Sequence, residues 1–176
     1  MTTYLMRDAA TFDSTMLDGA EAIAGYIGGP NAYRTWQDSE WEAVGHLPKL
    51  PIWVPKLQAS QAEARDQDLA ALLNIIQHYD MPRGQVIAFD LETSKADDAY
   101  MQEIAAYLEF WGYGTIAYGS LSTINGAYPS YLLKWDADWT GTAHLTDGFQ
   151  ATQWQDARLW DNSEISQELY DRLLWR

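Results

Sequence analysis

Two acidic residues close an otherwise apolar stretch that reads VIAFDLE over residues 86–92. Side chains two positions apart in a strand lie on the same face, so the carboxyl groups of Asp90 and Glu92 are expected to be neighbours. Like charges at short distance disfavour ionisation of both groups, and the pKa of one of them should therefore rise. A carboxyl group with a raised pKa can act as a general acid near neutral pH.

A third acid follows another apolar stretch in the same way. Residues 3–8 read TYLMRD and end in Asp8. Taken separately, each of these acids could equally cap a following helix or hold loop backbone. Their shared position at the ends of apolar strands favours one common site.

The segments that must position these acids are short and apolar, which is typical of buried strands. Seven such segments occur, at residues 3–8, 22–29, 50–55, 85–92, 114–120, 130–135 and 149–155.

Helical periodicity fills several of the gaps between these strands. Residues 60–79 and 96–112 each place apolar side chains on one face, and Gly112 suits the position after a helix end. Asp38-Ser39 and Ser163 are candidate caps for two shorter helices. Apolar strands that alternate with helices predict a parallel sheet buried on both faces.

The number of strands predicts that this sheet closes into a barrel. From about residue 114 onward the strands follow one another too closely for full helices, so the last third of the barrel should be nearly free of them. The 176 residues fit one domain, covering residues 1–176. In such a barrel, active sites lie at the carboxyl ends of the strands, where the three acids are expected.

The charge of the chain excludes several classes of partner. With a net charge of −14 and scattered Lys and Arg residues, neither nucleic acid nor an anionic membrane surface is an expected partner. No apolar run approaches the roughly 18 residues of a membrane span. The N-terminus shows no secretory signal, so the site of action is left open.

Residue types also limit the chemistry. The chain has no cysteine, and His46, His78 and His144 lack metal-ligand spacing, so we expect no metal and no cofactor. Nine Trp and eleven Tyr are unusually many. Most aromatic side chains pack in cores, but flat apolar faces beside polar groups also line grooves that hold sugars.

An ordered series of segments resembles glycoside hydrolase family 25, the lysozyme-like muramidases, together with related glycoside-hydrolase-like domains of actinobacteria and their phages. The segments are AFDLE (88–92), which is similar to the family's D-x-E strand, TIAYGS (115–120), KWDADW (134–139), TQWQ (152–155) and LWDNSEI (159–165). The resemblance covers nearly the whole chain. It implies an irregular TIM-like (β/α) barrel with about five β/α units followed by three strands.

The resemblance also implies roles for individual residues. Glu92 would be the general acid, and Asp90 would orient the N-acetyl group of the substrate as it attacks the anomeric carbon. Asp8 and Asp161 match the remaining acids of the rim, with Asp156 as a competitor of Asp161. Aromatic positions near the sugar groove match Tyr118, Trp135, Trp139 and Trp154.

Two departures from the family pattern bear on function. The first strand reads LMRDAAT, with Arg7 before Asp8 and without the serine of the usual G-x-D-x-S. The second, GYIGGPNAYRTW over residues 25–36, resembles the relatives of uncertain activity.

Two functions are therefore expected. One is a hydrolase that cuts the β-1,4 glycan of peptidoglycan without a metal, either as a phage endolysin, on a virion or within a longer exported chain. The alternative is a non-catalytic glycan-binding module of a phage tail or surface assembly.

Overall fold

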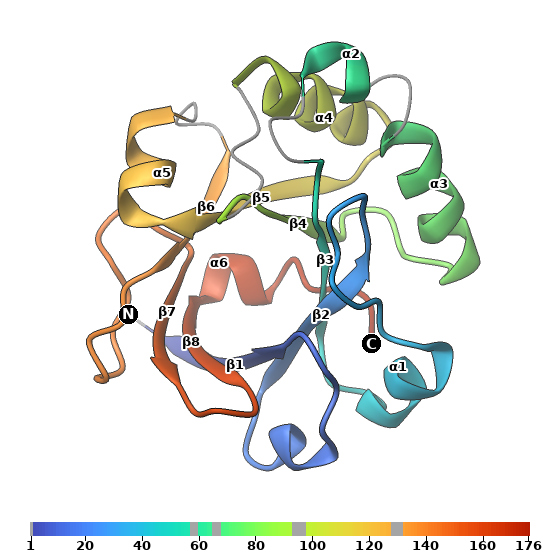
Figure 1. Cartoon of the computed structure of the whole chain (residues 1–176). Coiled ribbons are helices and arrows are strands. Elements are labelled where there is room, and N and C mark those ends of the chain that lie inside the picture. Colours follow the sequence, from blue (N-terminus) through green and yellow to red (C-terminus); the bar gives the residue numbers. More distant parts are fainter. Residues whose placement is uncertain (1, 57–59, 65–67, 93–97, 128–131) are drawn as a thin grey trace.

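Eight strands form a closed barrel in the computed structural model, which describes residues 2–56, 60–64, 68–92, 98–127 and 132–176 (Figure 1). Within these ranges the strands are β1 (Thr3–Ala9), β2 (Ala22–Gly28), β3 (Lys49–Trp53), β4 (Val86–Asp90), β5 (Gly114–Ser120), β6 (Leu133–Ala137), β7 (Ala151–Asp156) and β8 (Asp161–Ser166).

The strands follow the order of the sequence around the barrel. Each strand from β1 to β6 pairs in parallel with the next. The last strand, β8, closes the ring by pairing antiparallel with both β7 and β1. The predicted fold class, an irregular TIM-like α/β barrel, is confirmed.

Helices surround the first two thirds of the ring. They are the 3₁₀ helix η1 (Ser14–Leu17), α1 (Asp38–Val44), α2 (Gln61–Glu63), α3 (Leu69–His78), α4 (Asp98–Phe110) and α5 (Leu121–Ala127). A further short helix, α6 (Gln167–Tyr170), follows β8. The connections over residues 138–150 and 157–160 contain no helix. The expected loss of helices is therefore found after β6, but the predicted boundary near residue 114 is wrong, because α5 lies between β5 and β6.

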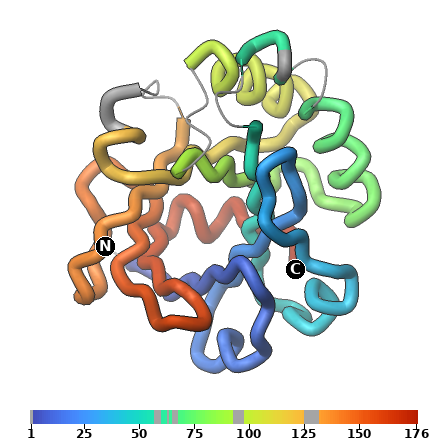
Figure 2. The backbone as a smooth tube through the Cα atoms, viewed as in Figure 1, coloured from blue at the N-terminus to red at the C-terminus, as the bar shows by residue number. Residues whose placement is uncertain are grey.

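Side-chain alternation divides the core into two parts. In β4, Val86 and Ala88 belong to the cluster inside the barrel, whereas Ile87 and Phe89 pack outward in the cluster that the helices cover. Leu169 and Leu173 complete the inner cluster at the amino end of the parallel strands, where α6 contacts β8 and β1 (Figure 2). The opposite end carries the strands' carboxyl termini.

The prediction that the last helix starts at Ser163 is wrong, because the helix begins four residues later, at Gln167. Ser163 lies inside β8, fully buried between β1 and β7, and accepts a hydrogen bond from Trp135 Nε1 at 3.2 Å. Helix α6 begins at Gln167, where Ser166 Oγ accepts from Leu169 N at 3.2 Å. Pairing on both sides favours a strand over the local preference of Ser163 for a helix start.

The predicted helix over residues 60–79 corresponds to two described helices, α2 and α3, and the helices predicted after Asp38 and over residues 96–112 agree with the structure apart from their ends. Gln37 precedes α1, and its N–H donates to Glu40 Oε2 at 2.6 Å, so the cap lies one residue before the predicted Asp38. Helix α4 ends as expected, with Gly112 at φ 85°. Residues 65–67, 96–97 and 130–131 of the predicted elements lie outside the described residues. No helix in the described ranges is both long and apolar enough for a membrane span.

Gly25 in β2 should tolerate no side chain. A Cβ there would lie 2.6 Å from Trp36 Cε3, and Trp36 is buried and donates from Nε1 to Ala9 O at 3.1 Å. We expect Gly25→Ala to lower the free energy of unfolding by about 1–3 kcal/mol, measured by urea titration. Ala43→Ser, on the exposed side of α1, should change it by less than about 0.5 kcal/mol. Equal stability of the two variants would contradict the packing described here.

Candidate active site

Acidic side chains from three strands meet at the carboxyl end of the barrel. Asp8 lies near the end of β1, and Asp90 ends β4. Because β8 is antiparallel, its first residue, Asp161, lies at the same end and pairs directly with Asp8. Asp90 pairs in turn with Tyr118 of β5.

Asp8 is the most deeply placed of these acids. It is 4% exposed, and Gln153 Nε2 donates to both of its oxygens at 3.3 Å. Burial raises the pKa of Asp8 well above its usual value, and the negative charge of Asp161 raises it further, whereas the bond from Gln153 lowers it. Charges on Glu92 and Asp90 add smaller increases. All four acids therefore influence one another electrostatically.

Asp90 and Glu92 are neighbours, as their spacing predicts. Asp90 Oδ1 accepts from Glu92 N at 3.1 Å, and Asp90 Oδ2 accepts from Tyr26 Oη at 3.3 Å. Burial raises the pKa of Asp90 against the lowering effect of these two bonds. The pKa of Glu92 is also raised, mainly by partial burial and to a smaller extent by the negative charge of Asp90. Part of the Glu92 side chain nevertheless reaches solvent. Both members of the pair thus have raised pKa values.

Asp161 is placed better than its competitor Asp156 for a part in this group. Burial, then the charges of Asp156 and Glu92, raises the pKa of Asp161 to about 6. Asp156 is exposed on the other strand of the hairpin and accepts from Arg158 N at 2.6 Å. The geometry therefore favours Asp161 as the fourth acid.

Three polar residues, Tyr26, Tyr118 and Gln153, lie on strand positions that face the inside of the barrel and interact with the acids. Tyr118 Oη donates to Gln153 Oε1 at 2.5 Å, and Gln153 Nε2 in turn donates to Asp8. Sequence reasoning missed Gln153 and Tyr26. Both continue the inward alternation of their strands, Ala151-Gln153 in β7 and Ala24-Tyr26 in β2, and that alternation is the signal that could have identified them.

Arg7, the departure from the family pattern beside Asp8, faces away from the acids. Its guanidinium donates to Asn162 Oδ1 and to Met16 O, each at 3.1 Å, and lies 5.2 Å from the ring centroid of Trp160. Arg7 therefore anchors the loop after β1, and its guanidinium does not point toward the acids at the mouth of the barrel.

The four predicted sugar-binding aromatics separate into two pairs. Trp135 is fully buried and packs under Tyr118, with ring centroids 4.2 Å apart, so it supports Tyr118 from inside the barrel and has no surface for a ligand. Tyr118 is itself 3% exposed. Trp139 is 53% exposed and lines a hollow of about 390 Å³ together with Trp154 and Asp156. Only this second pair offers an open apolar face.

Two further hollows adjoin the acids. One of about 390 Å³ is lined by Phe12, Trp160 and Asp161, and a smaller one of about 140 Å³ lies beside Tyr26 and Asp90. Polar and aromatic groups thus flank the acids on both sides. This arrangement suits an extended polar ligand.

The described residues contain no group of three or more His, Asp or Glu side chains that could hold a metal ion. His78 and His144 instead contact Asp38 and Asp138, at 3.0 and 3.1 Å.

Solved structures with the same fold include cell-wall-lytic enzymes. The spore cortex lytic enzyme SleM of Clostridium perfringens has a TM-score of 0.68 at 14% identity, covering 93% of this chain and 67% of that one. The autolysin LytC of Streptococcus pneumoniae, in complex with a synthetic peptidoglycan ligand, has a TM-score of 0.64 at 12% identity over 93% of this chain and 47% of its own. The barrel therefore has a lysozyme-like fold that peptidoglycan-lytic enzymes share.

An uncharacterized protein of B. stearothermophilus has a TM-score of 0.71 at 12% identity, with 96% of this chain and 99% of that chain covered. The chain thus spans the whole of this protein but about half the length of LytC. No protein-family model and no curated protein sequence matches the chain.

Because the acids have raised pKa values, their ionisation should destabilise the fold. The folded state binds more protons than the unfolded chain between the ordinary carboxyl pKa, about 4, and the raised values, which include about 6 for Asp161. The free energy of unfolding should therefore fall as the pH rises through this window. Asp8→Asn, which keeps an acceptor for Gln153, should reduce that fall and be more stable than the wild type at neutral pH.

Urea titrations at about pH 4.5 and about pH 7.5 measure this effect. Asp171→Asn, at an exposed position in the C-terminal segment, serves as the control and should keep the wild-type pH dependence. A wild type and an Asp8→Asn variant with the same dependence would show that Asp8 is not a protonated buried acid.

Proposed function

We propose that the chain is a glycoside hydrolase that cleaves the β-1,4 glycan of bacterial peptidoglycan, acting as an N-acetylmuramidase. The observation that carries the proposal is the convergence of Asp8, Asp90, Glu92 and Asp161 at one mouth of the barrel, each with a raised pKa. The lysozyme-like fold, found also in an autolysin bound to a peptidoglycan ligand, adds support.

Glu92 is the proposed general acid. Burial and the charge of Asp90 raise its pKa, which is the direction that a general acid requires, and it lies beyond the end of β4, where it reaches solvent. The proton of Glu92 moves to the glycosidic oxygen as the bond from that oxygen to the anomeric carbon breaks. The carbonyl oxygen of the neighbouring N-acetyl group bonds to the same carbon.

Water completes the reaction. It adds to the anomeric carbon, and the Glu92 carboxylate takes up one of its protons. The bond from the N-acetyl carbonyl oxygen to the anomeric carbon breaks in the same step, so the N-acetyl group stays on the sugar in its original form. Asp90, held by Tyr26 and by the backbone of Glu92, is placed to orient that N-acetyl group. Asp161, with a pKa of about 6, supplies negative charge opposite the carbon that becomes positive.

Tyr118 and Gln153 are proposed to position these groups. Tyr118 Oη is bonded to Gln153 and also lies close enough to Glu92 to lower its pKa. Since Tyr118 is buried on Trp135, its hydroxyl has little freedom to move. The pair links the acid on β1 with the acid that follows β4.

Replacement of Glu92 tests the proposal directly. Glu92→Gln removes the transferable proton and should reduce reducing-sugar release from purified cell walls by about 10²- to 10⁴-fold. Glu109→Gln, an exposed change on α4, should leave the rate unchanged. If the wild type is no more active than Glu92→Gln on walls of several chemotypes, the hydrolase proposal is wrong. Retention of intact glycan by both proteins would then identify a binding module.

Tyr118→Phe should move the pH dependence of hydrolysis. Loss of the hydroxyl removes an interaction that lowers the pKa of Glu92, so Glu92 keeps its proton to higher pH. The alkaline limb of the kcat/KM profile should therefore shift upward relative to the wild type. Tyr107→Phe on α4 is the matched control and should leave the profile in place. A downward shift would contradict the assignment of Glu92 as the acid.

A further inference from the structure

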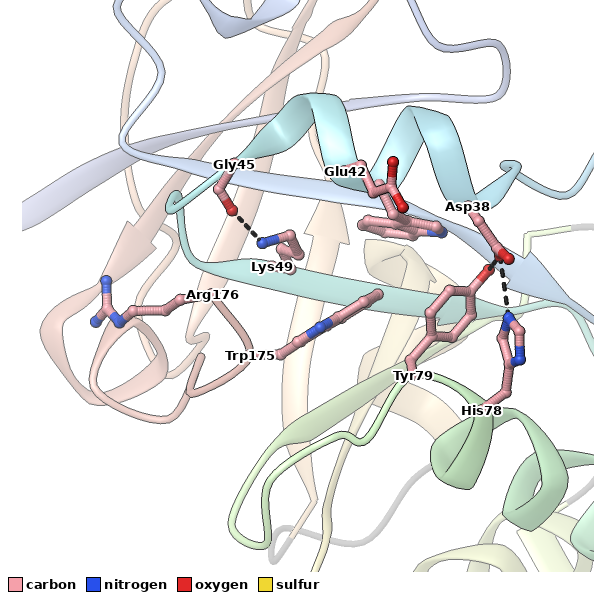
Figure 3. A pocket seen from close by; sticks show the side chains of 9 residues that line it. Asp38, Glu42, Gly45, Lys49, His78, Tyr79, Trp175 and Arg176 are labelled. Atoms are coloured by element: carbon pink, nitrogen blue, oxygen red, sulfur yellow. Dashed lines mark hydrogen bonds and ion pairs between the residues drawn. The ribbon is translucent and has the colours of Figure 1, made fainter.

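A separate hollow of about 360 Å³ lies at the amino end of the barrel, away from the acids of the candidate active site (Figure 3). Helix α1, the end of α3, the start of β3 and the C-terminal segment surround it. Lys49 begins β3, and its N–H donates to Trp175 O at 2.9 Å, which holds the C-terminal segment against the barrel.

Lys49 is an unusual residue for such a wall because it is a buried cation. It is 3% exposed, and its Nζ donates to Gly45 O at 2.6 Å and more weakly to Leu47 O at 3.4 Å. Within the described parts of the chain, Lys49 has no ion pair. Burial and the like charge of Arg176 lower its pKa to about 8. A buried charge without a counter-charge is costly, and an anion beside Lys49 and Arg176 would reduce that cost.

The floor of the hollow is aromatic. The ring centroid of Trp175 lies 4.7 Å from that of Trp41 and 5.1 Å from that of Tyr79, and Lys49 Nζ lies 5.6 Å from the Trp175 centroid. Trp41 Nε1 is buried and has no hydrogen-bond partner among the described residues. The wall thus combines flat apolar surface with an unused donor.

The opposite end of the hollow is acidic. Asp38 Oδ1 accepts from Tyr79 Oη at 3.1 Å and contacts His78 Nε2 at 3.0 Å, and Glu42 is exposed beside it on α1. Figure 3 shows Lys49 and Arg176 at one end, Asp38 and His78 at the other, and Trp175 between them. A ligand must therefore place its negative group at one end only.

We infer that this hollow binds a sugar acid. The carboxylate lies at Lys49 and Arg176, one face of the sugar ring stacks on Trp175, and ring hydroxyl groups donate toward Asp38 and Glu42. The site is distinct from the candidate active site, and it does not require the chain to be a hydrolase.

Three probes separate the parts of this ligand. N-acetylmuramic acid carries both the ring and the carboxylate, N-acetylglucosamine carries the ring alone, and lactate carries the carboxylate alone. Titration of the ¹⁵N-labelled protein follows the indole N–H signals of Trp41 and Trp175, which variants of each residue assign. We expect N-acetylmuramic acid to shift both signals and to bind about tenfold or more tightly than either partial probe.

Variants separate this site from the candidate active site. Lys49→Met keeps the aliphatic stem and should weaken binding by about tenfold or more, with the fold checked by circular dichroism. Arg176→Gln, at an exposed position, gives a second test that puts little strain on the fold and should also weaken binding. Glu92→Gln should leave these shifts unchanged, so failure of the proposed hydrolase would not affect the result.

Any of three results would overturn the inference. The first is no shift of the Trp175 signal at millimolar N-acetylmuramic acid, and the second is that N-acetylglucosamine binds as tightly as N-acetylmuramic acid. The third is that Arg176→Gln and a correctly folded Lys49→Met both bind N-acetylmuramic acid as tightly as the wild type.

Discussion

The antiparallel pairing of β8 between β7 and β1 is the interaction on which the rest of the structure depends. It closes the barrel, and it reverses the chain so that Asp161 lies directly opposite Asp8. Without this reversal the acid that begins the last strand would lie at the amino end, far from the other three. Closure of the fold and assembly of the acidic mouth therefore result from the same set of backbone hydrogen bonds.

The acidic mouth conflicts with stability. Burial raises the pKa of each acid, and a raised pKa is the direction that general-acid chemistry near pH 7 requires. The cost is limited by donors from neighbouring strands: Gln153 bonds to Asp8, and Tyr26 bonds to Asp90. These bonds lower the pKa values that burial raises, so they oppose part of the effect of burial.

The amino end of the barrel has a different construction. Helix α6 and the segment after it cover the inner core, and Trp175 packs against aromatic side chains of α1 and the end of α3. This covering buries Lys49 beside Arg176 and leaves an aromatic hollow. The two ends thus differ in charge: four acids gather at the mouth, and at the base lies a buried cation that has no ion pair among the described residues.

The sequence alone determined the barrel class and most of the strands, because apolar runs and the two-residue alternation of strands are local signals. It also made Asp90 and Glu92 neighbours, but on the assumption that both lie in one strand, whereas β4 ends at Asp90 and Glu92 lies in the turn that follows. The sequence left Asp156 and Asp161 as alternatives, predicted a helix start at Ser163, counted Trp135 among the aromatic residues near the sugar groove and missed Gln153 and Tyr26. Each of these depends on a partner far away in the chain. Pairing with Asp8 favours Asp161 over Asp156 as the fourth acid. Strands on both sides keep Ser163 in a strand, and burial beneath Tyr118 keeps Trp135 away from any ligand. Only the tertiary structure could decide them, because burial and pairing arise when the strands meet.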